Sequence, residues 1–400
     1  MRFRFPAVAV GVAGVALVAA GCGSTGNASS DSSSSASATA SQSSVGFGAQ
    51  NQQLCGASSA KPGYTNSIGR VSGGGKTLSG AGSTFVAPMM SDWAKTYNTS
   101  TGVQVSYQSI GSGGGIAQVQ ANTVDFGAAD TGMKPAEIAA AKGPVVQIPL
   151  LFGAVVPAYH VSGVASGLKF TGDLLGKIFA GKIKTWNDPA LTALNPGVKL
   201  PSEPIAVVHR SDASGTTAIF SNYLTQTSPT WVSTLGGPTQ SSSKTIAWPT
   251  GIGGKGNEGV SGAVTQTEGA IGYVELQYAL AQGTTIGQVQ NKAGNFIEPC
   301  IASASAAATG IAYPANLVTS FTNQSGTNAY PIAGSVYALI YEHQASKARA
   351  AALVSYFAWV LTSGQDLVTT LHYAPLPPDL QKLAYAQLKK ITVNGQPVAK

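Results

Sequence analysis

Charged residues are scarce in this chain, and metal-binding side chains are scarcer still. Only 10% of the 400 residues are Asp, Glu, Lys or Arg. The 23 basic residues outnumber the 16 acidic ones, but they are scattered and form no basic stripe with interleaved aromatic rings. The four histidines show no metal-ligand spacing: His160, His209, His343 and His372. The composition therefore argues against nucleic-acid binding and against a metal site, and no cofactor is expected.

Two common enzyme motifs are missing. The stretch Gly75-Lys76-Thr77 resembles the end of a P-loop, but Arg70 stands where that motif needs its first glycine. No Gly-x-Ser-x-Gly elbow occurs, so a hydrolase serine has no scaffold of that kind. The sequence therefore predicts neither nucleotide hydrolysis nor α/β-hydrolase chemistry.

The apolar stretch near the N-terminus is too short to span a membrane. Ala7–Ala20 follows Arg2 and Arg4 and ends just before Gly21-Cys22. A charged start, a short apolar stretch and small residues at its end predict an export signal over residues 1–21. The cysteine after the small residues resembles a bacterial lipobox, which implies cleavage before Cys22 and a diacylglycerol group on its sulfur. A plain signal peptide with a chance cysteine is the alternative.

The segment after this signal is built differently from the rest of the chain. Residues 23–50 are a Ser/Ala/Gly/Thr tract with almost no apolar content. Such a composition cannot bury enough surface to fold, so residues 22–75 are expected to form a flexible tether. In an exported chain, Cys55 and Cys300 predict one disulfide between the start of the mature domain and a distant loop. Two free thiols are the alternative.

From residue 76 onward, strand and helix patterns alternate, and an apolar content of 44% can fill the cores of two domains. The pattern predicts an α/β protein with mainly parallel central sheets. Strands are expected at 77–81, 103–109, 124–128, 145–159, 204–208, 270–274 and 329–341. Helices are expected at 83–97, 116–122, 174–180, 188–193, 215–225, 259–267, 346–362 and 378–390.

One strand-to-helix junction combines groups that bind an oxyanion. An apolar strand end at Val207-Val208 is followed by Arg210 and then by Ser214-Gly215-Thr216-Thr217 at the start of a helical pattern. A helix start presents unpaired N–H groups and the positive end of the helix dipole. Arginine adds a fixed, always charged donor. The junction therefore predicts an anion site, with an ordinary N-cap beside a surface arginine as the alternative.

Two further junctions have the same composition. Gly80-Ala81-Gly82-Ser83-Thr84-Phe85 and Ile110-Gly111-Ser112-Gly113-Gly114-Gly115 each place glycines and hydroxyls before a helical pattern. If the fold brings the three junctions together, their N–H groups and hydroxyls converge on one anion.

Several motifs resemble those of the PstS-like substrate-binding proteins of bacterial ABC-type phosphate uptake systems. The resemblance runs from about residue 76 to beyond residue 340. The motifs are the two glycine-rich stretches above with Tyr107-Gln108-Ser109, then Val124–Asp130, Gly181–Pro189, His209–Thr217, Gly256–Val260 and Ala270–Glu275. The resemblance implies a periplasmic-binding-protein-like (type II) fold in which two domains close on a ligand cleft. Domain one would comprise residues 76–158 and 330–400, and domain two residues 159–329.

The resemblance also implies which residues contact phosphate. The corresponding positions are Thr84, Phe85, Ser112, Asp130, Arg210, Ser214, Gly215 and Thr216, and Asp212 corresponds to the carboxylate that orients the arginine. The family's Asp-Gly-Ser-Gly is Asp-Ala-Ser-Gly at 212–215 here, and its Ser-Asp-Ala-Pro is Ala-Asp-Thr-Gly at 129–132. The implied partners are inorganic phosphate, the membrane subunits of an importer and, through the lipid, the outer face of the cell membrane.

The carboxylate of Asp130 could select the anion, for a physical reason that does not depend on the resemblance. A carboxylate next to an anion is unfavourable unless the anion donates a proton to it. Hydrogen phosphate can donate a proton, whereas sulfate at neutral pH cannot, so Asp130 would select phosphate. An enzyme with Ser214 or Thr84 as nucleophile is a competing hypothesis, but no matched general base accompanies either residue. A module for another tetrahedral oxyanion, or a phosphate sensor, is a third.

Overall fold

The computed structural model describes residues 55, 68 and 77–399, which all belong to one compact unit of the chain. The predicted signal peptide, the predicted lipidation site Cys22 and most of the predicted tether lie outside the described residues. Among the described residues, no helix combines the length and apolar character needed to cross a membrane.

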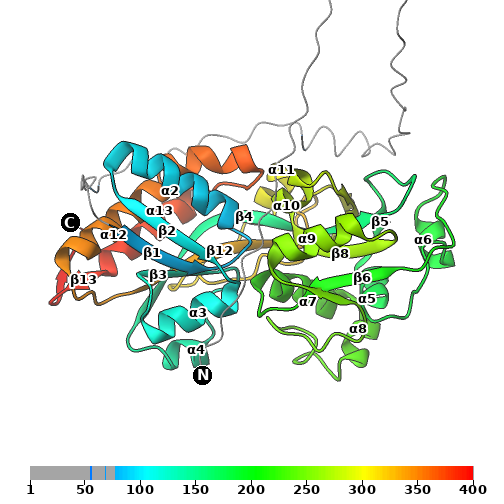
Figure 1. The fold of residues 1–400 in the computed structure, drawn as a ribbon, viewed down its shortest axis with the longest axis horizontal. Coiled ribbons are helices and arrows are strands. Elements are labelled where there is room, and N and C mark those ends of the chain that lie inside the picture. The colour runs from blue at the N-terminus through cyan, green and yellow to red at the C-terminus, as the bar shows by residue number, and fades with distance from the viewer. Residues whose placement is uncertain (1–54, 56–67, 69–76, 400) are drawn as a thin grey trace, which may run out of the picture. The chain divides into compact units, whose positions relative to one another are not determined.

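A nine-stranded mixed sheet organises the described part of the chain (Figure 1). Its order is β2-β1-β3-β12-β4-β8-β6-β7, and β9 pairs with β4 outside this path. The bounds are β1 Thr77–Gly82, β2 Gln104–Ser109, β3 Phe126–Ala129, β4 Val145–His160, β6 Ala206–Arg210, β7 Ile252–Gly254, β8 Ala270–Glu275, β9 Thr285–Ile286 and β12 Ala333–Tyr341.

The strand β4 belongs to both halves of this sheet. Residues 145–154 pair antiparallel with β12, and residues 155–160 pair antiparallel with β8. We call β2, β1, β3, β12 and the first part of β4 the β1 half, and the second part of β4 with β8, β6, β7 and β9 the β8 half. All but the ends of β4 are buried, which explains its continuous apolar run.

The sheet contains as many antiparallel as parallel strand pairs, so the prediction of mainly parallel central sheets is wrong. The pairs of β1 with β2 and β3, and of β6 with β7 and β8, are parallel. At the centre, β12 runs antiparallel to β3 and β4, and β4 runs antiparallel to β8. The chain crosses from one half to the other on β4 and comes back into the first half on β12, so these two strands must run in opposite directions.

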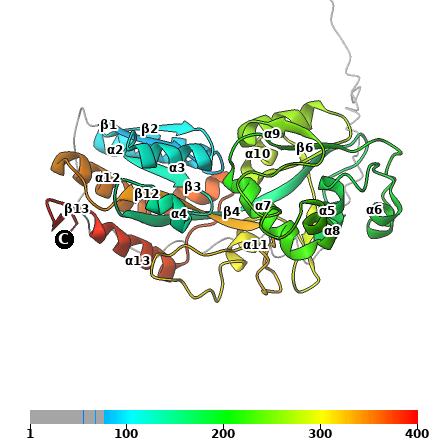
Figure 2. The ribbon, with the colours of Figure 1, turned by 90° about the horizontal axis from the view of Figure 1, so that it is seen from below.

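Helices pack on each half of the sheet (Figure 2). Those of the β1 half are α2 Ala87–Thr101, α3 Ser112–Ala121, α4 Pro135–Ala139, α12 Lys347–Val360 and α13 Pro378–Gln387. Those of the β8 half include α5 Gly172–Phe179, α7 Gly215–Thr227, α8 Pro229–Thr234, α9 Gly256–Gln266 and α10 Leu276–Ala281. The remaining elements are β5 Lys169–Phe170, α6 Pro189–Leu194, β10 Gln288–Gln290, β11 Phe296–Ile297, α11 Ile301–Ala306, η1 Ser363–Leu371, η2 Leu388–Lys390, β13 Thr392–Val393 and β14 Gln396–Pro397.

Two helix starts differ from the predicted ones. The helix α2 buries Met89, Trp93 and Tyr97, as their spacing predicts, but it begins at Ala87 because residues 84–86 form a turn. The helix α3 begins at Ser112 and takes in three glycines that were expected to precede it. A Cβ atom at Gly115 would lie 2.5 Å from the Cα atom of Gly82, so only glycine allows this helix to approach β1 so closely.

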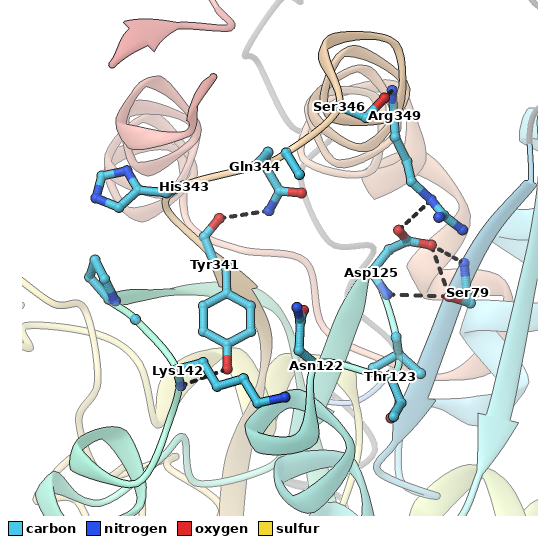
Figure 3. A pocket seen from close by; sticks show the side chains of 14 residues that line it. Ser79, Asn122, Thr123, Asp125, Lys142, Tyr341, His343, Gln344, Ser346 and Arg349 are labelled. Atoms are coloured by element: carbon cyan, nitrogen blue, oxygen red, sulfur yellow. Dashed lines mark hydrogen bonds and ion pairs between the residues drawn. The ribbon is translucent and has the colours of Figure 1, made fainter. Parts of the chain in front are cut away.

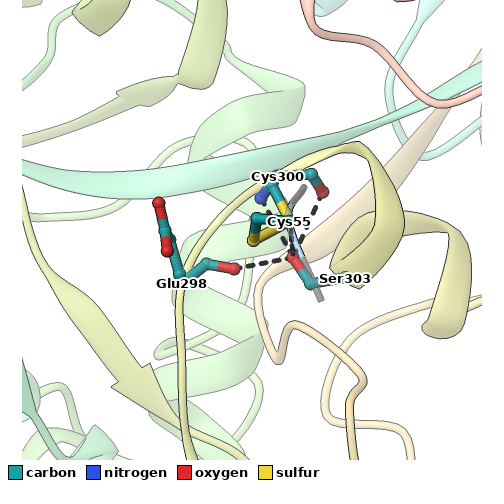
Figure 4. The surroundings of a disulfide bond; sticks show 4 residues. All are labelled: Cys55, Glu298, Cys300 and Ser303. Atoms are coloured by element: carbon teal, nitrogen blue, oxygen red, sulfur yellow. Dashed lines mark hydrogen bonds between the residues drawn. A yellow bond between two sulfur atoms is a disulfide. The ribbon is translucent and has the colours of Figure 1, made fainter. Parts of the chain in front are cut away.

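Cys55 and Cys300 form a disulfide, which confirms the predicted pairing (Figure 4). Their Cα atoms are 5.8 Å apart although the residues are separated by 245 positions in the sequence. The backbone N–H of Cys300 donates to Ser303 Oγ at 2.9 Å, at the start of α11. The bond therefore ties Cys55, the first described residue, to the start of α11.

Candidate functional site

The three predicted junctions meet where the two halves of the sheet face each other. Thr84 follows β1, Ser112 opens α3 and Thr216 lies in the first turn of α7. Asp130, directly after β3, lies between them: its backbone N–H donates to Ser112 Oγ at 3.2 Å, and its Oδ2 accepts from Thr216 Oγ1 at 3.4 Å. Hydroxyls and a carboxyl from both halves are thus brought within a few ångströms of one another.

The start of α7 enters this cluster at Gly215. A Cβ atom at that position would lie 2.5 Å from both Asp130 Oδ2 and Ser112 Oγ, so a larger residue could not be accommodated. Ser214 is the N-cap: its Oγ accepts from Thr217 N at 3.0 Å. The N–H groups of Gly215 and Thr216, which precede Thr217, have no acceptor within the helix, so they and the helix dipole are available to an anion.

Arg210 is buried, with 3% of its surface exposed, and it is held by Asp212. Its Nε lies 2.7 Å from Asp212 Oδ1, and its Nη2 lies 2.5 Å from Asp212 Oδ2. Burial works to raise the pKa of Asp212, but the hydrogen bonds and charge of Arg210 outweigh it and hold that pKa below its usual value. This two-bond pairing leaves Nη1, 3.4 Å from Thr216 Oγ1, directed into the cluster.

Asp130 is the least satisfied group in the cluster. Burial raises its pKa from 3.8 to about 6, although the hydroxyls of Ser83, Thr216 and Ser112 and the charge of Arg210 oppose the increase. Within the described residues, Asp130 Oδ1 and Ser83 Oγ are buried without a hydrogen bond of ordinary geometry. A buried carboxyl oxygen without a donor, beside a buried arginine, indicates a place for a ligand that carries both negative charge and a proton.

Comparison with known proteins identifies the family of this chain. A family model described as a PBP superfamily domain matches residues 33–363. The phosphate-binding protein PstS of Xylella fastidiosa (strain Temecula1) is 44% identical over 310 residues, which cover 76% of this chain and 83% of that protein. The phosphate-binding protein PstS of Haemophilus influenzae is 40% identical over 316 residues, covering 78% of this chain and 92% of that protein. The chain belongs to the PstS family of phosphate-binding proteins.

A solved structure supports the fold of this PstS-family chain. The phosphate-binding protein from Stenotrophomonas maltophilia superposes with a TM-score of 0.65 at 20% sequence identity, covering 78% of this chain and 93% of that one. The periplasmic-binding-protein-like α/β fold expected from the sequence is therefore confirmed. Membership of a family of binding proteins also makes the chain a binding protein rather than an enzyme.

The candidate nucleophiles of the competing enzyme hypothesis have structural partners in this PstS-family chain. Ser214 Oγ caps α7, and Thr84 Oγ1 accepts from Asn257 Nδ2 at 2.8 Å. An activated nucleophile would instead donate its proton to a neighbouring base. In the described part of the chain, no group of three or more His, Cys, Asp or Glu side chains could hold a metal ion.

One residue of the site, Asn257, was not predicted. Its Nδ2 donates to Thr84 Oγ1 at 2.8 Å and to Thr216 Oγ1 at 3.2 Å, and its Oδ1 accepts from Glu275 N at 2.9 Å. Asn257 therefore joins the hydroxyls of the two halves directly. It lies at the start of α9 in the Gly-Asn-Glu-Gly-Val motif, so this fourth glycine-containing junction was the signal that could have revealed it.

Three tyrosines that were also not predicted hold the backbone of the first junction. The hydroxyls of Tyr107, Tyr278 and Tyr373 donate to the carbonyl oxygens of residues 83, 84 and 85 at 2.9, 2.6 and 2.6 Å. No short motif could have indicated them, because the partners are backbone atoms 24, 194 and 288 positions away. They fix the turn that carries Thr84 and Phe85.

Ala213 replaces the glycine that is usual in the family, and this replacement does not strain the backbone. Ala213 is not among the described residues with positive φ, so the glycine usual at this position in the family is not needed for its conformation. Gly111, in contrast, has φ of +83°, and a Cβ atom there would lie 2.3 Å from Asp212 Oδ2. The close approach between the second and third junctions depends on that glycine.

A second polar cavity, of about 390 Å³, lies elsewhere on the β1 half (Figure 3). It contains none of the predicted site residues. Its charged side chains have partners: Arg349 Nε lies 2.6 Å from Asp125 Oδ1, and Asp125 Oδ2 accepts from Ser79 Oγ at 2.8 Å. Lys142 Nζ donates to the carbonyl oxygen of Ala121 at 2.8 Å. Among the described residues that line this cavity, no carboxyl oxygen is buried without a hydrogen bond, as Asp130 Oδ1 is.

The raised pKa of Asp130 predicts how the ligand-free protein responds to pH. Between pH 3.8 and about 6, Asp130 is protonated in the native state but ionised in the unfolded state. Protonation of Asp130 therefore stabilises the native state fully below pH 3.8, and this stabilisation is lost as the pH rises through about 6. In phosphate-free buffer at pH 8, Asp130→Asn should raise the free energy of unfolding by about 2–3 kcal/mol, measured by urea denaturation.

At pH 4 the same variant should match the wild-type protein, because Asp130 is then neutral. Asp212→Asn is the matched control with the opposite sign. It should lower stability at pH 8, since the native protein favours the ionised form of that group. Equal stability of Asp130→Asn and wild type at pH 8 would contradict the assignment.

Proposed function

We propose that this chain binds inorganic phosphate on the extracytoplasmic side of the cell membrane and delivers it to the membrane subunits of an ABC importer. The observation that carries the proposal is the buried Asp130 carboxyl, which has an oxygen without a donor and lies in the same cluster as Arg210. Membership of the PstS family supports the same ligand.

The proposed ligands come from both halves of the sheet. Thr84, Phe85, Ser112 and Asp130 would contact phosphate from the β1 half, and Arg210, Ser214, Gly215 and Thr216 from the β8 half. Asp212 would orient the arginine, and we add Asn257 as the residue that aligns the hydroxyls of Thr84 and Thr216. We also propose the division into domains 76–158 plus 330–400 and 159–329, closing about β4.

The proposed contacts would be sufficient for tight binding. A hydrogen bond to a charged group contributes roughly 1.5–3 kcal/mol. About five effective ones would give the roughly 8–10 kcal/mol of micromolar or tighter binding after the cost of association.

Asp130 would distinguish phosphate from sulfate. Above pH 6 its carboxylate can only accept a proton, which hydrogen phosphate can donate and sulfate cannot. Below pH 6 a protonated Asp130 can donate to either anion.

We therefore expect sulfate binding to strengthen as the pH falls from 8 to 5, while at pH 8 sulfate binds at least about 100-fold more weakly than phosphate. Isothermal titration calorimetry with phosphate, sulfate and arsenate across this range measures the effect, with arsenate expected as a weaker competitor. Asp130→Asn should bind sulfate at every pH with little change between 5 and 8. Wild-type protein that binds sulfate as tightly as phosphate at pH 8 would refute the role of Asp130.

Replacing Arg210 should weaken every oxyanion rather than change the selectivity. Arg210→Met removes the buried positive charge, and we expect phosphate and arsenate to lose roughly 100-fold or more in affinity at pH 8. Arg349→Met in the second polar cavity is the control, because it removes the same charge at a site that shares no residue with this one. Equal losses in both variants would indicate a general effect of charge instead of a direct contact.

The alternatives remain testable with the same protein. Calorimetry would reveal a module for another oxyanion, and turnover of a phosphomonoester would show an enzyme. A phosphate sensor would bind phosphate but fail to support uptake when importer subunits are present.

We further propose that lipid on Cys22 anchors the protein, with residues 23–50 as the tether. The cysteine after small residues at the end of the apolar stretch supports this assignment. Expression of Cys22→Ala should move the protein from the membrane fraction to the soluble fraction and abolish incorporation of labelled fatty acid. Unchanged membrane association and labelling would contradict the anchor.

A further inference from the structure

One ion pair crosses between the two halves of the sheet beside the proposed phosphate site. Lys244 Nζ lies 2.7 Å from Glu137 Oε1 and 2.9 Å from Glu137 Oε2. Glu137 belongs to α4 of the β1 half, and Lys244 lies between α8 and β7 of the β8 half. Of the ion pairs between described residues, this is the single one that joins the halves.

The pair is largely shielded from water. The Lys244 side chain is 8% exposed and that of Glu137 is 27% exposed. A buried charge is strongly destabilising when its partner is removed, whereas an exposed pair contributes little. Opening the cleft would separate the two residues and return both to water, so the pair stabilises the closed arrangement specifically.

Both members are linked to the proposed phosphate ligands. The Lys244 carbonyl oxygen accepts from the N–H of Ser214, the N-cap of α7, at 2.9 Å. Glu137 Oε2 accepts from Lys134 N at 2.7 Å, only four residues after Asp130. Lys134 and Lys244 also line a cavity of about 370 Å³ that reaches Asp130 between the halves.

We propose that Glu137 and Lys244 are positioning residues that hold the cleft closed over bound phosphate and slow its release. The inference rests on the proposed function, because it assigns these residues to the same site. Since the pair forms only when the halves meet, its loss should act on the dissociation rate constant more than on the association rate constant.

The test compares Glu137→Gln, Lys244→Met and the charge-swapped double variant Glu137→Lys/Lys244→Glu. Dissociation is followed by chasing radiolabelled phosphate with excess unlabelled phosphate, and affinity by calorimetry. We expect each single variant to release phosphate roughly 10-fold faster or more, with an association rate within about 3-fold of wild type. The swapped variant should recover most of the slow release, because the attraction is restored.

Glu137→Gln separates this role from direct attraction of phosphate by Lys244. If Lys244 mainly acted as a positive charge for the ligand, removing Glu137 would free that charge and strengthen binding. The proposed role predicts the opposite sign. Lys177→Met is the matched control: Lys177 pairs with Asp173 at 2.7 Å, but both residues lie in α5, within one half. It should leave the release rate unchanged.

If the wild-type protein binds phosphate but Glu137→Gln releases it no faster than wild type, this inference is overturned and the proposed function is not. Absence of phosphate binding to wild type would overturn the proposed function and this inference with it. Urea denaturation in phosphate-free buffer checks that the variants fold. If Glu137→Gln does not fold, Glu137→Asp replaces it as a milder change. Phosphate release that is moderately faster in Glu137→Asp than in wild type then supports the inference. An unchanged release rate refutes it.

Discussion

The site depends on keeping the guanidinium of Arg210 charged in a place that water hardly reaches. A buried charge is costly unless it is paired, and Asp212 supplies that pair through Nε and Nη2. Thr216 links the remaining nitrogen to Asp130, whose own burial makes its ionised form unfavourable. A ligand that brings negative charge to the arginine and a proton to the carboxyl satisfies both groups at once, which is why the two residues together define the proposed ligand.

The sheet supplies the geometry that lets these groups meet. Because β4 is shared between the halves and the chain comes back on β12, each half presents its strand-to-helix junctions to the other. Two glycines permit the final approach: Gly111 leaves room for the Asp212 carboxylate, and Gly215 leaves room for Asp130 and Ser112. The Glu137–Lys244 pair spans the same interface, and the Lys244 carbonyl oxygen accepts from the N–H of Ser214, so the proposed closure and the proposed phosphate contacts share a backbone link.

Much of the fold could be predicted from local patterns, whereas the errors arise from packing between segments that are far apart in the chain. The spacing of Met89, Trp93 and Tyr97 correctly predicted α2, and Gly215 was correctly placed at the start of α7. The three glycines of α3 were read as a loop, because their use in close packing against β1 is visible only when β1 is in place. The antiparallel centre of the sheet was missed for a related reason: strand direction depends on where the chain crosses and returns.

For the site, the sequence by itself determined the chemistry: hydroxyls, helix starts, one arginine and one carboxylate in a recognisable order, and with them the family. These features are encoded within a few residues of one another, since a helix start and its cap are local. Tertiary structure alone decided that Asn257 would bridge Thr84 and Thr216, that three distant tyrosines would hold one turn, and that Lys244 would meet Glu137 across 107 positions. Such contacts depend on sheet register and on the packing of segments far apart in the chain, which no short stretch of sequence specifies.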